Sequence, residues 1–299
     1  MTGLEGLSPH LSGPALLSVL IALGFVVGVL TGLFGVGGAF LLTPLLQVAL
    51  GIPYPVAIGS SLSYTIGASS SAAARHWRLR NFEPGMVLIL AGAAMVGAVL
   101  GGMANRSMEQ GLGKTNYTLT MHGLFMVILA LSAVLIGRGG RVSREGKSLL
   151  QRLPLPPRID LPASQLMQVS IPGLCVVGLL VGVLKGMMGI GGGVLFMPLL
   201  ILVVGLEAHQ AVGTSLGVVL FSSIAGTVKY GLDGNVNMWI VMPLLISSVI
   251  GVQIGVWICQ KLHAEKLRRH FAILVLLVTA LLAWDFVRML LRATSLAGV

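Results

Sequence analysis

Two glycine-rich stretches, 154 residues apart, contain the groups that could bind an anion. Residues 28–46 read GVLTGLFGVGGAFLLTPLL and residues 182–200 read GVLKGMMGIGGGVLFMPLL, with 11 of 19 positions identical. Glycine tolerates backbone conformations that end a helix, so we expect one helix to end and another to begin within each stretch. The free N–H groups and the positive dipole end at the start of a helix suit an anion. The pattern therefore predicts two anion-binding breaks.

The side chains around the breaks leave alternatives open. The glycines could bind a ligand or merely let helices cross closely. The hydroxyl groups that follow could bond to oxyanion oxygens, or could cap helices and bond to backbone carbonyls. Lys185, where the first copy has Thr31, could attract an anion or could snorkel from a helix end. The candidate substrate-binding residues are Gly35, Val36, Gly37, Gly38, Ser60, Ser61, Lys185, Gly189, Ile190, Gly191, Gly192, Thr214 and Ser215.

The composition shows what surrounds these groups. The chain is 56% hydrophobic and 9% charged, whereas soluble domains carry roughly 25% charged residues. We therefore predict an all-α polytopic membrane protein embedded in the lipid bilayer. Because about 20 apolar residues span a bilayer, the segments at 39–50 and 193–205 are too short for a full hydrocarbon core, and the sequence leaves open whether each completes a crossing or is re-entrant. The predicted segments are 15–33, 39–50, 54–74, 86–104, 118–137, 168–187, 193–205, 210–229, 238–260 and 271–291.

The segments fall into two sets of five. Residues 1–137 form the first predicted transmembrane repeat, 138–167 a basic linker, and 168–299 the second repeat. Of the 19 basic residues, 13 lie in the linker and the connections at 75–80 and 261–269. Basic connections face the cytoplasm, so we expect a cytoplasmic linker and both termini outside. Because five is odd, the second repeat is inverted, as in many secondary transporters, and the Gly-rich broken helices are expected to meet between the halves.

Two further spacings predict local contacts. Gly97 and Gly101, with Gly251 and Gly255, have the GxxxG spacing that lets membrane helices pack closely. Asp285 and Arg288 are three residues apart and could pair on one helix face.

Several other functions are disfavoured. The stretch 213–217 matches the G-x-S-x-G pattern of serine hydrolases, but neither the strand–turn–helix context nor a base is visible, so we predict no enzyme. Cys175 and Cys259 lie in apolar runs and indicate no metal site or cofactor. In a membrane protein, the net charge of +10 reflects cytoplasmic loops rather than a nucleic-acid partner.

The doubled motif resembles a known family. The pattern G-x-x-x-G-x-x-G-x-G-G-(G/A)-x-x-x-x-P-L-L, followed by A-x-G-(S/T)-S-L, is similar to the TauE/SafE group of sulfite-exporter-like permeases, over nearly the whole chain. The resemblance implies export of a small sulfur-containing anion, such as sulfite or an organosulfonate, or of a related organic anion across a bacterial-type inner (plasma) membrane. No Walker motif is present, so we expect a secondary transporter with alternating access.

Two alternatives share these features. An anion channel would use the same donors without coupling, and a membrane scaffold or assembly protein would keep the glycines for packing only. The sequence also leaves open the exact substrate, the direction of transport, the coupling ion (proton or sodium) and the formation of a homo-oligomer.

Overall fold

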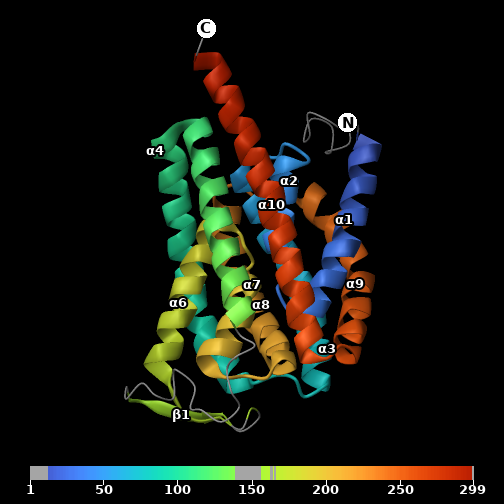
Figure 1. Cartoon of the computed structure of the whole chain (residues 1–299), viewed down its shortest axis with the longest axis vertical. Helices are drawn as coiled ribbons and strands as arrows, with labels where there is room; N and C mark the ends of the chain where they lie inside the picture. The colour runs from blue at the N-terminus through green and yellow to red at the C-terminus, as the bar shows by residue number, and fades with distance from the viewer. Residues whose placement is uncertain (1–12, 139–155, 162–163, 165, 298–299) are drawn as a thin grey trace.

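The computed structural model describes residues 13–138, 156–161, 164 and 166–297, which form a bundle of helices with a small two-stranded sheet at one end (Figure 1). The helices of the first half are α1 (Gly13–Phe34), α2 (Ala39–Val48), α3 (Tyr54–Arg78) and α4 (Pro84–Arg138). The antiparallel strands β1 (Arg158–Leu161) and β2 (Leu166–Ser170) follow. The remaining elements are α6 (Ile171–Met188), α7 (Gly193–Leu199), the π-helical η3 (Leu200–Val204), α8 (Ala208–Leu232), α9 (Met238–Lys261) and α10 (Ala264–Ala297).

The predicted segments are all helical, although their ends differ. Two of them, 86–104 and 118–137, belong to the single element α4, which bends at Gly113 (φ 67°, ψ 159°). The expected connection at 105–117 is therefore helical except at this bend. α10 begins at Ala264 instead of residue 271, so basic residues expected in a connection belong to its first turns. Part of the predicted linker forms β1 and the start of β2, whereas 139–155 lie outside the described residues.

The outer surface of the bundle is apolar. Six helices of the described chain are long and apolar enough to cross a membrane. Large apolar side chains project outward, among them Leu88 at 78% and Ile246 at 72% exposure. Such a surface is stable against lipid but not against water. The chain is an all-α polytopic membrane protein, as its composition predicts.

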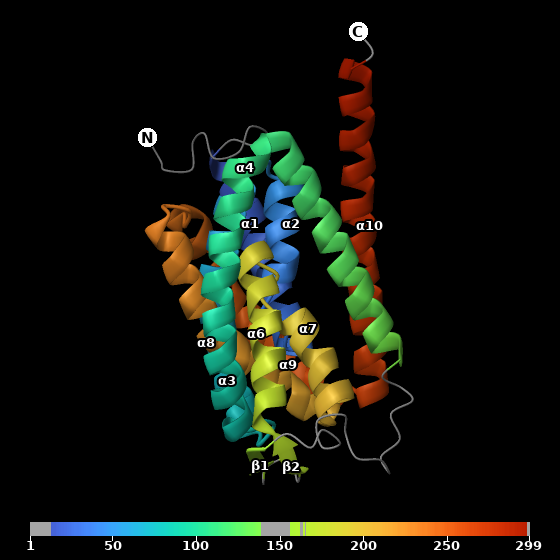
Figure 2. The same ribbon diagram turned by 90° about the vertical axis from the view of Figure 1, so that its left-hand side faces the viewer.

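The two short helices turn back inside the bundle. Figures 1 and 2 show α1 running down from the upper end and α2 returning toward it, whereas α6 rises from the sheet and α7 descends again. The start of α3 lies at the upper end, where the ring of Tyr54 is 6.2 Å from that of Tyr117, shortly after the bend in α4. Each break between the paired helices therefore lies in the interior.

Glycines let helices from different halves cross closely. α1 packs along α9, and α6 packs along the first arm of α4 (Figure 1). A Cβ added to Gly101 would lie 2.0 Å from the carbonyl oxygen of Val183, and one added to Gly255 would lie 2.1 Å from that of Val29. Gly255 stands 154 positions after Gly101, and Val183 stands 154 positions after Val29, so the two contacts are equivalent in the two halves. The predicted close packing of Gly97, Gly101, Gly251 and Gly255 is confirmed.

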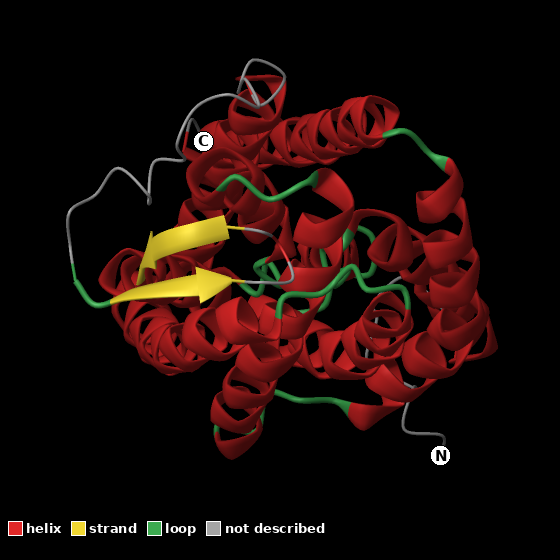
Figure 3. Cartoon of the chain, turned by 90° about the horizontal axis from the view of Figure 1, so that it is seen from below, coloured by secondary structure: helices red, strands yellow, loops and turns green. Residues whose placement is uncertain are grey.

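The strands β1 and β2 occupy the end of the bundle opposite the start of α1. Seen from below, they lie across the ends of neighbouring helices (Figure 3). β2 leads directly into α6. Its last residue, Ser170, caps that helix, because the hydroxyl accepts a hydrogen bond from Gly173 N at 3.3 Å. The second half of the bundle therefore begins at the end where the sheet lies.

Candidate functional site

The structure brings the two predicted breaks into contact. A Cβ built on Gly193 would lie 2.3 Å from Cα of Val36, and one built on Gly191 would lie 3.1 Å from Cβ of Ala39. Every residue from 34 to 39 and from 188 to 194 is buried. Residues about 154 positions apart therefore form one continuous buried site.

The two breaks have the same backbone form. Gly38 precedes α2 and Gly192 precedes α7, each with φ 81°, a left-handed conformation that favours glycine. The carbonyl oxygen of each glycine accepts hydrogen bonds from the amides three and four residues further on, at 2.8–3.1 Å. Among the described residues, no acceptor pairs with the amides of 36–40 or 190–194. The helix starts thus keep free donors at a buried site, an arrangement that an anion could use; the anion site stays a prediction.

A hydroxyl group from each half hydrogen-bonds to the break in the other half. Ser215 of α8 donates to the carbonyl oxygen of Gly35 at 2.8 Å, and Thr43 of α2 donates to that of Gly189 at 3.1 Å. The hydroxyl of Ser215 therefore bonds to backbone, which was one of its two predicted roles. Thr43 was not predicted, since an isolated threonine in an apolar helix carries no sequence signal.

Hydroxyl groups on one face of α3 line the first break. Thr65 donates to the carbonyl oxygen of Gly37 at 2.9 Å, and the Oγ of Ser69 lies 3.2 Å from a Cβ built on Gly37. Ser61 and Ser69 are buried, and neither hydroxyl has a partner in the described structure. The spacing 61, 65, 69 follows one helix face, and this periodicity could have added Thr65 and Ser69 to the predicted site.

Ser60 and Thr214 hydrogen-bond to backbone amides outside the two breaks. The Oγ of Ser60 accepts from the amide of Asn237 at 3.1 Å, and the Oγ1 of Thr214 accepts from the amide of Glu83 at 3.2 Å. Those amides belong to the connections that lead into α9 and α4. The two hydroxyls therefore secure helix connections, and the structure does not bring them to the free amides of the breaks.

The amine of Lys185 is buried beside the second break. Its side chain is fully buried, and its Cδ lies 3.3 Å from a Cβ built on Gly192. The snorkelling alternative is therefore wrong. Nζ donates to the carbonyl oxygen of Val219 at 2.8 Å, to Ser222 Oγ at 2.7 Å and to Ser223 Oγ at 2.8 Å. In the described part of the chain, no carboxylate pairs with this amine.

The family of the chain follows from comparison with known proteins. The family model described as sulfite exporter TauE/SafE matches residues 20–282. The chain belongs to the sulfite exporter TauE/SafE family. The doubled glycine motif lies within the matched range, so the TauE/SafE resemblance stated for the sequence is confirmed.

Relatives extend over most of the chain. The "Probable membrane transporter protein YunE" of Bacillus subtilis (strain 168) is 25% identical over 278 residues, covering 89% of this chain and 97% of that protein. A "Probable membrane transporter protein" of Xylella fastidiosa (strain Temecula1 / ATCC 700964) is 29% identical over 272 residues, covering 90% and 95%. The "Sulfite exporter TauE/SafE family protein 3" of Arabidopsis thaliana is 27% identical over 124 residues, which is 42% of this chain and 25% of that protein. No solved structure matches the chain.

These findings give the general class of activity. The protein is a multi-pass membrane transporter of the TauE/SafE family. Within the described residues, no group of three or more His, Cys, Asp or Glu side chains could hold a metal ion.

Proposed function

We propose that this TauE/SafE protein is a secondary transporter that exports a small sulfur-containing anion, such as sulfite or an organosulfonate, across the inner membrane. The observation that carries the proposal is the contact between two buried breaks whose backbone amides are free. When protonated, Lys185 would add a positive charge beside them. The anion would be held at the two helix starts and released by alternating access.

An anion with several acceptor oxygens fits the chemistry of this site. Unpaired donors in a lipid-embedded interior cost free energy, and an acceptor-only ligand would pair with them. The unpartnered hydroxyl of Ser69 lies 3.2 Å from a Cβ built on Gly37 at the first break, and it could donate to a further oxygen. A sulfite or sulfonate group has oxygens in several directions, so it could accept from both breaks at once.

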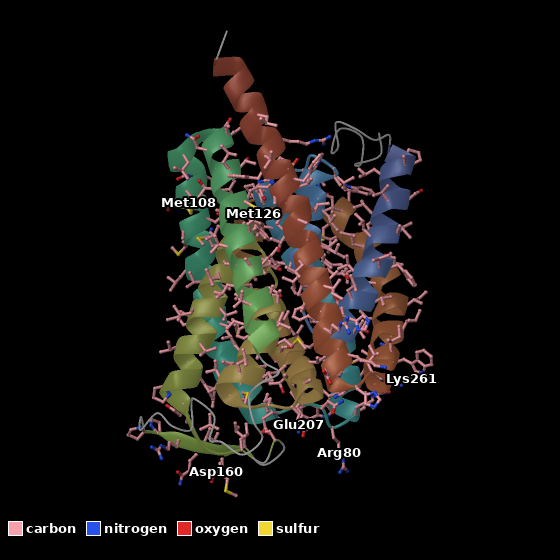
Figure 4. The ribbon with its side chains drawn as sticks, viewed as in Figure 1. Arg80, Met108, Met126, Asp160, Glu207 and Lys261 are labelled. Carbon is pink, nitrogen blue, oxygen red and sulfur yellow. The ribbon has the colours of Figure 1, made fainter. Side chains whose placement is uncertain are left out.

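We further propose that residues 1–137 and 168–299 are inverted repeats joined by a cytoplasmic linker, with both ends of the chain outside. Paired contacts separated by 154 positions support the repeat. α1 begins and α10 ends at the same end of the bundle. Arg80 and Lys261 lie at the opposite end (Figure 4), which suits the cytoplasmic side.

The contacts between the halves suit a structure that must alternate. The bonds of Ser215 to Gly35 and of Thr43 to Gly189 are neutral hydrogen bonds, each worth about 1 kcal/mol. Both can break when one half moves against the other without a large barrier. A binding site shared by two halves would therefore open to one side at a time.

Flux measurements test the proposal. The purified chain is reconstituted in liposomes loaded with sulfite or ethanesulfonate, and efflux is compared with that from protein-free liposomes. We expect faster, saturable efflux that sulfate, thiosulfate or sulfonates inhibit to different extents. Efflux no faster than from protein-free liposomes would overturn the assignment, and efflux proportional to concentration without saturation would indicate a channel.

A matched pair of glycine variants tests the site. Gly37 has φ 74°, and a Cβ there would lie 2.6 Å from Cγ1 of Val219, whereas Gly113 has φ 67° and no atom within 4 Å. G37A and G113A therefore both add a Cβ at a positive φ, but only G37A also meets neighbouring side chains at the break. We expect G37A to lower efflux at least about tenfold at normal expression and G113A to leave it nearly unchanged. Equal efflux in the two variants would count against the site.

A further inference from the structure

A buried acid–base pair lies away from the breaks, in the upper half of the bundle. Nε2 of His122, on the second arm of α4, is 3.1 Å from Oδ2 of Asp285 on α10. Nδ1 of His122 is 3.1 Å from the hydroxyl of Tyr54 and 3.0 Å from the carbonyl oxygen of Thr118. The side chain of His122 is fully buried and that of Asp285 is 22% exposed. His122 lies one helical turn before Met126, which is labelled in Figure 4.

In the described structure, no basic side chain besides His122 forms an ion pair with Asp285. The sequence suggested that Asp285 pairs with Arg288, but the structure places the Arg288 guanidinium 5.4 Å from the centre of the Trp284 ring. Across the described ranges, no lysine or arginine pairs with Asp285. The titratable groups that face His122 are Tyr54 from α3 and Asp285 from α10. Tyr117, on α4 itself, meets the Tyr54 ring edge-on, and no charged side chain of α6 or α8 in the described structure is bonded to the pair.

This arrangement favours a bound proton. With neutral His122, the pair carries one negative charge in a largely buried place, which costs free energy. When His122 takes a proton from water, the pair becomes an ion pair with no net charge.

The pair contacts elements that lead to both breaks. Tyr54 begins α3, and the short connection before it joins α2, whose start is the first break. Tyr117 hydrogen-bonds to Asn105, whose Nδ2 donates to the carbonyl oxygen of Met187 at 2.7 Å. Met187 lies in the last turn of α6, just before the second break. A change in the charge of the His122–Asp285 pair can therefore alter the packing around both breaks.

We propose that His122 and Asp285 bind the proton whose movement is coupled to that of the anion. This inference rests on the proposed anion transport and deepens it, because it names the coupling ion. The partly exposed Asp285 would receive the proton, and the buried ring of His122 would retain it.

Proton flux in liposomes tests the coupling. Liposomes with an internal pH indicator are given an ethanesulfonate gradient, since this anion carries no proton of its own, or a sulfite gradient with a protein-free correction. Exchange of labelled anion is measured in parallel at equal pH on both sides. We expect H122Q and D285N to lose at least about 90% of the anion-driven proton flux and to keep exchange within about twofold. R288Q, on the same helix three residues from Asp285, should behave as wild type. Wild-type levels of proton flux in D285N, or anion flux without proton flux in the wild type, would overturn the inference.

A measurement that needs no transport separates the two proposals. Nitrogen NMR of the histidine-labelled full chain in lipid nanodiscs follows the ring of His122, whose signal is identified by its loss in H122Q. We expect the ring to exchange its proton and D285N to alter this exchange, since the protons of a coupled pair belong to the pair and not to either residue. If the ring stays in one state while anions are transported, the proton site is wrong. If the ring titrates as expected but no anion moves, the proposed transport fails while the proton site stands.

Discussion

Replacing Lys185 by methionine should weaken anion binding without unfolding the protein. The ammonium is fully buried and bonds only to neutral oxygens. Its desolvation costs several kcal/mol, which offsets most of what those bonds contribute. Methionine has a similar volume and no charge, and Ser222 keeps its bond to the carbonyl oxygen of Val218 at 2.6 Å. We therefore expect the free energy of unfolding of K185M to stay within about 2 kcal/mol of wild type.

The effect on binding should be larger. Lys185 Cδ approaches Gly192 at the second break. For an anion at the break, about 6 Å from the ammonium and with an effective dielectric constant of about 20, the attraction is about 3 kcal/mol. Losing it corresponds to roughly a 100-fold weaker affinity.

Ligand-dependent thermal stability in detergent and saturation of efflux in liposomes measure this change. K229M is the matched control, because Lys229 already pairs with Asp233 and contributes little net charge. If K185M does not accumulate, K185Q keeps donors for Ser222 and Ser223 without the charge. Wild-type affinity in K185M or K185Q would refute the role assigned to the ammonium.

Three further outcomes follow from the packing and the orientation. G101A should lower the free energy of unfolding by about 1–3 kcal/mol, measured by thermal denaturation, because its Cβ would overlap a backbone carbonyl of α6; G123A, with no atom within 4 Å, should not destabilise the protein. N105A should cost about 1–3 kcal/mol in the same assay, since a partly buried carbonyl of α6 and a buried tyrosine hydroxyl both lose their bond to the Asn105 amide; a smaller loss would mean that other donors replace it. In a variant without native cysteines, a cysteine at the exposed Glu109 should react with an impermeant maleimide in intact cells, and one at Arg80 only after permeabilisation. The reverse labelling would contradict the proposed orientation.

The sequence alone determined that lipid surrounds this protein and where its two glycine-rich helix breaks lie. A chain with 9% charged residues cannot cover itself with a water-compatible surface. Gly38 and Gly192 adopt a left-handed conformation that other residues rarely take, so local chemistry ends one helix and starts the next there. The same motif was enough to indicate the TauE/SafE family.

Only the tertiary structure decided which groups meet. The burial of Lys185 depends on α8 supplying three oxygens, and a sequence window around the lysine contains none of them. Asp285 has Arg288 nearby in sequence, yet its partner is His122, 163 residues away. Spacing along one helix shows which residues share a face, but the rotation of that face toward a neighbour is set by packing between distant segments. The contact between the two breaks has the same origin, because it depends on glycines that let α1 approach α9 and α6 approach α4.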